Sequence, residues 1–416
     1  MIIPSIDLMD GQAVQLRQGK ERVLIAERRP QELVQDFNRF GDVAVIDLDA
    51  ALNTQKKDKP ADNLALIKAL CRLGNVRVGG GIRTVERGKT LLRAGAQKLI
   101  IGTSAEPDFL MHFPPSRVLV ALDHLKSGEV VDHGWTKGTG ESVLDRAKRL
   151  APYCSGFLVT FVEDEGCMAG MSPEAVLMLT EQLPHPLTVA GGVNTTENAV
   201  AVMKQGVDVQ VGMALYTGML DLSAVVVQSL DFQKQQGLIP TIVQDVDSKQ
   251  VLMLAYSSPE SLKASLESGK GIYFSRSRQA LWEKGQTSGH TQKLISARVD
   301  CDQDTLLFQV QQTGAACHTG SASCFGDAAF SMPTLFETLR HRKEVLPKDS
   351  FSAQLFTNRK KLLRKVMEEA FEVATCQNQD ELIWEISDLI YMTSVLAVDE
   401  GLSWQDLMSE LGGRHR

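Results

Sequence analysis

The first half of the chain, from residue 1 to about residue 220, alternates short apolar runs with longer amphipathic stretches. The runs are rich in β-branched residues and almost continuously apolar, which is typical of strands buried on both faces in a parallel sheet covered by helices. Eight strand–helix units in about 220 residues predict a (β/α)8 TIM barrel, with an open doubly wound sheet as the alternative. The eight runs read IIPSID, VAVIDL, VRVGGG, KLIIGT, RVLVALD, GFLVTFV, LTVAGG and VDVQVG.

The pattern changes after the segment SLDFQKQQGLIP, where alternating apolar and polar positions replace the continuous runs. TIVQDVDSKQVLMLAY predicts a hairpin with its turn at Asp247-Ser248, and ARVDCDQDTLLFQVQQ alternates as a single strand. Towards the C-terminus the apolar positions recur with the period of a helix. We therefore predict a TIM-barrel domain at 1–229, a small α+β, mainly β domain at 230–328 and an all-helical domain at 329–416.

Composition supports a multidomain globular protein that acts on small molecules. The chain has 416 residues, of which 43% are hydrophobic and 23% charged, enough for several packed cores. A net charge of −7 and a pI of about 5.7 argue against nucleic acid or an anionic membrane as a partner. The sequence has no apolar run near the roughly 18 residues that span a bilayer, and MIIPSIDLMD has no basic region that would indicate a secretory signal. A cytoplasmic location is expected.

Polar residues and glycines follow the apolar runs of the first half, at the ends that form the active face of a TIM barrel. Asp7 ends the first run and Asp123 the fifth, and glycine-rich ends recur at matched offsets in the two halves of the barrel. Taken singly, such a glycine is more often a tight turn, and such an aspartate a helix cap. Their repetition favours two phosphate cradles with two aspartates between them, which suit a substrate phosphorylated at both ends. The candidate cradle residues are Gly80, Gly81, Gly102, Thr103, Gly191, Gly192 and Gly212.

Over its whole length this half resembles the phosphoribosylformimino-aminoimidazole-carboxamide-ribotide isomerases of histidine biosynthesis. The matching segments are PSIDLMDGQAVQLRQG, VIDLDAA, VGGGIRT, IIGTSA, ALD with the later GW, VAGGV and VGMALYTG. The resemblance implies an Amadori rearrangement of an aminoaldose to an aminoketose. It also implies that Asp7 and Asp123 form the acid–base pair, one protonating the ribose ring oxygen and the other moving the proton from C2. Thr160 and Trp135 match positions that orient the substrate.

One segment departs from that family. After the sixth strand the family usually shows Thr-Asp-x-x-x-Asp-Gly, whereas TFVEDEG places Phe161 and Glu165 at the two aspartate positions. Either this loop binds the substrate differently, or the barrel has lost its activity and remains as a scaffold.

Three aspartates at every second position mark the middle domain. If the strand is regular, Asp300, Asp302 and Asp304 project to one face and Cys301 to the other. Three carboxylates spaced in this way form a hard oxygen site suited to Mg²⁺.

The chain has seven cysteines, an odd number in so long a chain, which argues against a disulfide framework. Three of them lie close together in the sequence. Cys301, Cys317 and Cys324 supply the thiolates that Zn²⁺ prefers, in a reducing cytoplasm. Three ligands leave an open fourth position, where bound zinc lowers the pKa of a water molecule. The alternatives are a structural zinc completed by His318, or three buried cysteines.

The strings WEKGQTSGHTQ, DCDQD, ACHTG and SCFGD resemble phosphoribosyl-AMP cyclohydrolase over roughly residues 231–328. The resemblance implies hydrolytic opening of the adenine N1–C6 bond by a zinc-held water, with magnesium on the three aspartates and zinc on the three cysteines. It also implies a homodimer in which the cysteine of the DCD motif comes from the other subunit. The family commonly has Asn where His290 stands. Candidate phosphate-binding cations are Arg276, Arg278 and Lys284.

Acidic residues cluster on two predicted helices near the C-terminus. They are flanked by apolar residues, which favours a divalent-metal site over a solvated face paired with Arg364 and Lys365. The segments SFSAQLF and KVMEEAFEV resemble the all-helical, MazG-like phosphoribosyl-ATP pyrophosphohydrolases over about residues 329–416. The resemblance implies binding of an ATP-derived substrate, with Mg²⁺ held against its triphosphate for α–β cleavage. The candidate magnesium ligands are Glu368, Glu369, Glu372, Glu385 and Asp388.

Together the three resemblances predict a fused, multifunctional enzyme of histidine biosynthesis with two hydrolase activities and one isomerase activity. Its predicted cofactors are Zn²⁺ and Mg²⁺, and its substrates are phosphoribosyl nucleotides. Three alternatives remain open: an inactive barrel that acts as a scaffold, a zinc-stabilised nucleotide-binding regulator without turnover, and a helical domain that hydrolyses nucleoside triphosphates in general.

Overall fold

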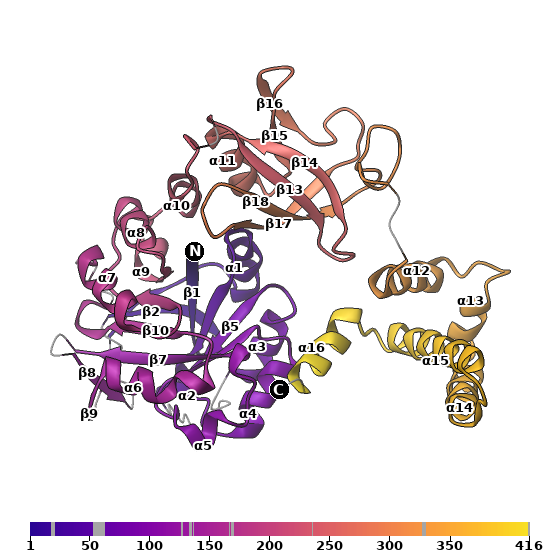
Figure 1. The fold of residues 1–416 in the computed structure, drawn as a ribbon, viewed down its shortest axis with the longest axis horizontal. Helices are drawn as coiled ribbons and strands as arrows, with labels where there is room; N and C mark the ends of the chain where they lie inside the picture. The colour runs from indigo at the N-terminus through magenta and orange to yellow at the C-terminus, as the bar shows by residue number, and fades with distance from the viewer. Residues whose placement is uncertain are drawn as a thin grey trace. The chain divides into compact units, whose positions relative to one another are not determined.

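The computed structural model describes residues 1–17, 21–52, 63–125, 128–132, 135, 137–165, 167, 170–234, 236–326 and 330–414 (Figure 1). The chain forms two compact units. The first comprises Met1–Val246, Val251–Gly326 and Gly412–Arg416, and the second Asp247–Gln250 and Asp327–Leu411. The predicted boundary at 229/230 falls within the first unit, and the one at 328/329 lies outside the described residues.

Eight parallel strands form a barrel in the first unit. The barrel is closed because β10 and β7, the first and the last of these strands in their order across the sheet, also pair with each other. This closure confirms the predicted TIM barrel and excludes the open sheet. The strands pair in the order β10, β11, β12, β1, β4, β5, β6 and β7. Their bounds are β1 Ile2–Met9, β4 Val43–Asp47, β5 Val76–Gly79, β6 Lys98–Ile101, β7 Val118–His124, β10 Phe157–Phe161, β11 Leu187–Ala190 and β12 Asp208–Val211.

Helices follow the strands and cover the barrel (Figure 1). Several begin at a hydroxyl cap: Thr84, Ser142, Ser172 and Thr195 each accept a hydrogen bond from a backbone N–H in the first turn. Two antiparallel additions extend the sheet, β2 (Gln12–Arg17) with β3 (Glu21–Ile25), and β8 (Glu129–Asp132) with β9 (Lys137–Ser142). The helices are α1 Pro30–Phe37, α2 Leu48–Leu52, α3 Leu64–Leu70, α4 Val85–Arg93, α5 Pro107–Leu110, α6 Val143–Leu150, α7 Pro173–Gln182, α8 Thr196–Met203, α9 Met213–Tyr216 and α10 Leu222–Ser229.

The small β-rich domain also lies in the first unit. The predicted hairpin is present as β13 (Ile239–Asp245) and β14 (Val251–Ser257). The predicted single strand is instead two antiparallel strands, β17 (Gln292–Val299) and β18 (Leu306–Gln312), joined by a turn. These strands form one sheet in the order β14, β13, β18, β17. The helix α11 (Pro259–Ser268) leads into a separate hairpin of β15 (Ile272–Ser275) and β16 (Ala280–Glu283).

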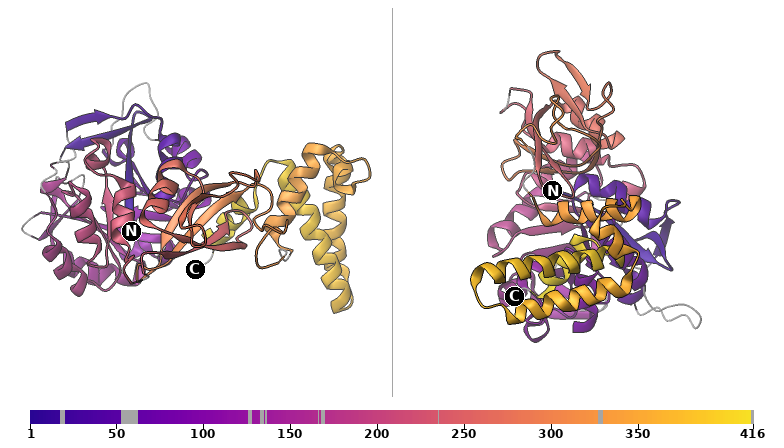
Figure 2. Two further views of the ribbon diagram at one scale, coloured as in Figure 1. Left: turned by 90° about the horizontal axis from the view of Figure 1, so that it is seen from above. Right: turned by 90° about the vertical axis from the view of Figure 1, so that its right-hand side faces the viewer.

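The second unit is helical, as predicted. Its two longest helices, α14 (Arg359–Thr375) and α15 (Gln379–Asp399), lie side by side (Figure 2). Each begins at an asparagine cap, Asn358 or Asn378. Among the described helices, we find none whose length and hydropathy would allow it to cross a membrane. The remaining helices are α12 Met332–Val345, α13 Phe351–Phe356 and α16 Trp404–Arg414.

A buried ion pair joins neighbouring barrel strands at their N-terminal ends. Arg77 Nε donates to Asp42 over 2.9 Å, and both residues are buried. Arg77 also contacts Asp208 at 3.4 Å, and Asp42 also accepts from Arg298 of β17 at 3.3 Å. Asp42 therefore compensates one cation inside the barrel and a second one on the small β domain.

We expect Asp42→Asn to lower the free energy of unfolding of the first unit by about 3 kcal/mol, because it leaves the buried Arg77 guanidinium short of a counter-charge. Urea unfolding followed by amide hydrogen exchange in β4 and β5 measures the effect. The matched control is Glu21→Gln, which removes an exposed pair with Arg17 at 3.7 Å and should cost at most about 0.5 kcal/mol. Equal effects of the two substitutions would contradict the prediction.

Candidate functional site

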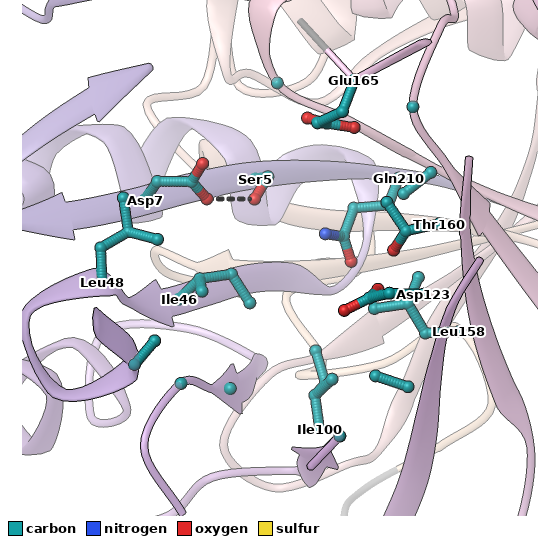
Figure 3. Close-up of a pocket in the computed structure, with 18 of the residues that line it drawn as sticks. Ser5, Asp7, Ile46, Leu48, Ile100, Asp123, Leu158, Thr160, Glu165 and Gln210 are labelled. Carbon is teal, nitrogen blue, oxygen red and sulfur yellow. Dashed lines mark hydrogen bonds between the residues drawn. The ribbon is translucent and has the colours of Figure 1, made fainter. Parts of the chain in front are cut away.

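A cavity of about 270 Å³ opens at the C-terminal ends of the barrel strands (Figure 3). Asp7, near the end of β1, and Asp123, near the end of β7, both line this cavity. The Ser5 hydroxyl donates a hydrogen bond to Asp7 over 2.9 Å, and the indole N–H of Trp135 donates to Asp123 over 2.9 Å. The barrel thus places the two predicted aspartates in one space, each held by a neighbouring donor.

The predicted phosphate cradles line the same cavity. Gly80 and Gly81 have φ of +90° and +64°, and a Cβ at Gly81 would lie 2.4 Å from the Cβ of Ala50. Gly191 has φ of +89°, and a Cβ there would lie 2.7 Å from the carbonyl oxygen of Phe161. Only glycine fits these positions, which leaves their backbone uncovered by a side chain. The predicted residues that line the cavity are Gly80, Gly81, Gly102, Thr103, Thr160, Gly191, Gly192 and Gly212.

A third carboxyl group, that of Glu165, faces the same cavity (Figure 3). Burial raises its pKa to about 8, and the charges of Asp7 and Asp123 act in the same direction. Burial also raises the pKa of Asp7 to about 6, against the hydrogen bond from Ser5. The pKa of Asp123 is raised by burial as well, against hydrogen bonds from Thr160 and Trp135.

These shifts separate the protonation states of neighbouring carboxyl groups near neutral pH. Glu165 keeps its proton, whereas Asp7 has mostly lost its own. A protonated carboxyl and a carboxylate in one enclosed space can donate and accept a proton on the same bound molecule. The cavity is therefore equipped for acid–base chemistry.

Glu165 and Gln210 are two of the cavity residues that the predicted site did not include. Glu165 was recognisable in the sequence only as a departure from a family pattern. Gln210 projects into the cavity beside Thr160 and Asp123 (Figure 3). Its signal is an amide within the otherwise apolar end of the last barrel strand, VQV.

The three aspartates of the middle domain come together, but not in the predicted way. Asp300, Asp302 and Asp304 offer oxygens within 4.8 Å of one another. They lie in the turn between β17 and β18 and not on alternate positions of a strand. The Asp300 carboxylate accepts hydrogen bonds from the backbone N–H groups of Asp304 and Thr305, at 3.0 and 3.1 Å, and so closes the turn. Local side-chain hydrogen bonding has replaced the strand ladder here.

A lysine compensates the charge of this aspartate turn. Lys234 Nζ lies 2.7 Å from Asp302 and 2.5 Å from Asp304. Hydrogen bonds to the two carboxylates raise the pKa of Lys234. The donor set is three hard oxygens, which suits Mg²⁺, and a cation already sits on two of them.

Two of the three predicted zinc ligands are neighbours. The thiols of Cys317 and Cys324 lie within hydrogen-bonding reach of each other. Thr319 Oγ1 donates to Cys317 Sγ over 3.1 Å, and hydrogen bonds from Thr319 lower the pKa of Cys317. Cys301 lies in the exposed aspartate turn. Within the described residues, every cluster of at least three potential ligands is made of carboxylates alone, so Cys301 does not join the other two thiols.

The predicted phosphate-binding cations divide into two places. Lys284 is buried and close enough to both thiols to interact with them electrostatically, while burial itself lowers the pKa of its ammonium group. Arg276 and Arg278 are exposed on the turn between β15 and β16, and the Arg276 guanidinium lies 3.8 Å from the ring centroid of Tyr256.

All five predicted carboxylates of the helical unit fall into two clusters that share Glu369. One consists of Glu368, Glu369 and Glu372 on α14, and the other of Glu369 with Glu385 and Asp388 on α15. Glu369 is buried, and Lys365 Nζ lies 2.6 Å from its carboxylate. Burial, a hydrogen bond with Glu369 and the neighbouring negative charges raise the pKa of Glu372. Lys365 pairs with two of the five acidic groups, and Arg364 acts electrostatically on Glu368, which leaves an excess of negative charge that a divalent cation would balance.

Three family models match the chain in consecutive segments. Residues 1–221 match the model described as histidine biosynthesis protein. Residues 253–326 match phosphoribosyl-AMP cyclohydrolase, and residues 332–415 match phosphoribosyl-ATP pyrophosphohydrolase.

Curated relatives match the C-terminal half. The histidine biosynthesis bifunctional protein HisIE of Vibrio cholerae serotype O1 is 42% identical over 203 residues, which cover 46% of this chain and 97% of the relative. The proteins of the same name from Escherichia coli K12 and Bacillus subtilis 168 are 42% and 43% identical over 196 and 194 residues. These matches cover 45% and 44% of this chain, and 97% and 93% of the relatives.

The raised pKa of Asp7 gives the barrel a pH-dependent stability. Because the folded state holds this proton more tightly than the unfolded state, the free energy of unfolding falls as pH rises from 3.8 to about 6. We expect Asp7→Asn to be more stable than the unchanged chain by about 3 kcal/mol above pH 6, and no more stable below pH 4. Urea unfolding at several pH values measures the difference. Asp108→Asn, on the exposed first turn of α5, is the control; the prediction is wrong if both variants keep the unchanged chain's pH profile.

Proposed function

This chain belongs to the histidine biosynthesis protein family, and we propose that its three domains catalyse three consecutive reactions on phosphoribosyl nucleotides. The helical domain hydrolyses phosphoribosyl-ATP to phosphoribosyl-AMP and pyrophosphate, and the small β domain opens the adenine ring of phosphoribosyl-AMP by hydrolysis. The barrel converts the resulting aminoaldose to the aminoketose. One observation carries the proposal: both aspartates and both glycine cradles line a single cavity in a barrel fused to two hydrolase-family domains.

In the helical domain, the carboxylates of α14 and α15 hold the divalent cation that the triphosphate requires. Glu369, Glu385 and Asp388 supply closely spaced oxygens, which fit Mg²⁺. A bound Mg²⁺ neutralises charge on the triphosphate. Lys365 Nζ lies 2.8 Å from Glu368 and 2.6 Å from Glu369, and so holds these two carboxylates on one side of α14.

In the small β domain, Cys317 and Cys324 form half of a thiolate site. Their neighbouring sulfurs fit Zn²⁺, and Cys301 of a second copy of the chain completes the set. Zinc held there supplies a water molecule of lowered pKa. Lys284 offsets the negative charge of the thiolates, and the aspartate turn that carries Cys301 supplies the oxygens for Mg²⁺.

In the barrel, Asp7 and Asp123 act as the acid and the base of the Amadori rearrangement. One protonates the ribose ring oxygen as the ring opens, and the other removes the proton from C2. The cradles at Gly80–Gly81 and Gly191–Gly192 bind the two terminal phosphates through backbone N–H groups.

A barrel without activity is the second candidate, and one observation favours it. A Cβ placed on Gly191 would lie 3.0 Å from the carboxyl oxygen of Glu165, so this carboxyl adjoins one cradle. Above its raised pKa of about 8, the ionised Glu165 would repel a phosphate there, and at neutral pH its protonated carboxyl still takes up space beside the cradle. The barrel would then act as a scaffold for the two hydrolases.

A coupled assay on phosphoribosyl-ATP with Mg²⁺ tests the proposal with one variant for each domain. We expect Glu369→Gln to stop pyrophosphate release, Cys324→Ala to accumulate phosphoribosyl-AMP, and Asp7→Asn to accumulate the aminoaldose. General acid–base catalysis contributes about 10²- to 10⁴-fold, so Asp7→Asn should slow the last step by that factor. If the unchanged chain stops at the same aminoaldose, the barrel is the scaffold.

A shared thiolate site predicts complementation between two inactive variants. We expect Cys301→Ala and Cys317→Ala each to abolish ring opening, because each removes a ligand from every site. Mixed subunits should regain about a quarter of the activity, since half of the dimers are mixed and each of these has one intact site. Loss of adenine absorbance follows the reaction.

The control for this experiment mixes Cys317→Ala with Cys324→Ala. These residues are neighbours in one copy, so no mixed dimer contains an intact site. Recovery in this control, or none in the first mixture, would show that the three cysteines do not act across two copies.

A further inference from the structure

A groove of about 620 Å³ lies in the small β domain between β14 and the β15–β16 hairpin. This volume is in the range of small-molecule sites, about 300–1,000 Å³. The groove combines the aromatic side chains of Tyr256, Phe274 and Trp282 with the guanidinium groups of Arg276 and Arg278. An aromatic wall and a pair of cations form the combination that recognises a nucleotide, because a base has π-faces and a phosphate has negative charge.

Trp282 is the aromatic residue with the firmest support. It is half-buried and packs on Tyr273, with ring centroids 5.9 Å apart at an angle of 47°. Tyr273 is itself fully buried, and its hydroxyl donates to Gln292 over 2.7 Å. The packing on Tyr273 therefore holds the Trp282 ring in a defined position in the wall of the groove.

The cations of the groove are available for an anionic ligand. Arg276 and Arg278 lie on the exposed turn that joins β15 and β16. Within the described part of the chain, neither of them forms an ion pair with a carboxylate. Arg276 stacks on Tyr256, which orients its guanidinium, and the backbone N–H of Arg278 bonds to Ser275 Oγ at 3.3 Å. The turn thus presents two positive charges to the groove, and the stacking on Tyr256 orients that of Arg276.

The strand that carries Trp282 also connects the groove to a residue beside the thiols. Lys284 follows Trp282 by two positions, a spacing that places side chains on one side of an extended strand. Its backbone N–H still bonds to the carbonyl of Gly271 across the hairpin, at 2.9 Å. Lys284 interacts electrostatically with Cys317 and Cys324, and the two arginines precede Trp282 in the hairpin. Along the chain, Trp282 therefore lies between the arginines and the residue that interacts with the thiols.

We propose that this groove binds the AMP half of the cyclohydrolase substrate, with the purine stacked on Trp282 and the phosphate held by Arg276 and Arg278. This inference rests on the proposed ring-opening function and adds its base-recognition site. Stacking on Trp282 directs the reactive edge of the purine towards Lys284 and the thiols, while the arginines fix the opposite end of the nucleotide. Trp282 is thus a substrate-positioning residue.

Binding of three probes to the full chain separates the two ends of the groove. We expect Trp282→Leu to weaken AMP and adenosine by about tenfold and to leave ribose 5-phosphate unchanged, since base stacking is lost. Arg278→Gln should weaken AMP and ribose 5-phosphate but leave adenosine unchanged. Isothermal titration without added Mg²⁺ measures the affinities, because the acidic clusters of the helical domain then repel phosphate.

Two further variants control for folding and packing. Leu281→Ala alters an exposed neighbour in β16 that does not line the groove, and should bind all three probes like the unchanged chain. Trp282→Phe keeps an aromatic face and should recover most of the affinity for AMP. The proposal is overturned if Trp282→Leu binds AMP normally, or if it weakens ribose 5-phosphate as much as adenosine.

Measurement of KM and kcat for ring opening distinguishes failure of the groove assignment from failure of the proposed reaction. If the unchanged chain opens the purine ring, Trp282→Leu should raise KM for phosphoribosyl-AMP about tenfold with a smaller change in kcat, whereas an unchanged KM overturns the groove assignment. If the unchanged chain opens no ring but binds AMP in a Trp282-dependent manner, the proposed reaction fails and the nucleotide site stands.

Discussion

Carboxyl groups that lie close enough to interact repel one another when they are ionised, and the described part of this chain gathers such groups in three places. The repulsion is lowered in two ways. The barrel cavity half-buries Asp7, Asp123 and Glu165, which raises the pKa of each, so that part of the charge is removed by protonation. The aspartate turn binds Lys234, and the helical clusters bind Lys365. The same clustering is the basis of the acid–base chemistry that we propose for the first place and of the divalent-cation binding that we propose for the other two.

The barrel could be predicted from sequence because its signal is repeated and local. Each strand is a continuous apolar run, and each candidate residue of the cavity follows such a run directly, so the closed sheet brings them together. Glu165 and Gln210 were harder to place. Glu165 lies in a loop after its strand, with its carboxyl beside Gly191, and Gln210 is one polar residue in an apolar strand. Neither spacing nor composition distinguishes them from surface positions.

The aspartate turn shows where periodicity misleads. Alternation across DCDQD is as regular as in a strand, yet Asp300 hydrogen-bonds to the backbone four and five residues later and Gln303 adopts φ of +64°. A short polar side chain that bonds to its own backbone competes with the ladder, and a hydrophobicity pattern does not record this competition. In the helical unit, the period correctly predicted the helices and the acidic clusters. Hydrophobicity alone does not separate the two neighbouring leucines of α14, of which Leu362 is fully buried and Leu363 is 41% exposed.

Lys234 lies in the segment between α10 and β13, the seam that joins the barrel to the small β domain. Its ammonium group rests on carboxylates that belong to the second of these domains. This linking segment therefore does more than connect the two domains, because its lysine neutralises part of the negative charge of a neighbouring site. A cyclohydrolase domain that began after this segment would lack Lys234. Cations from solvent would then be the source of positive charge for the three carboxylates of its aspartate turn. Fusion has in this way made the electrostatics of one domain depend on the end of another.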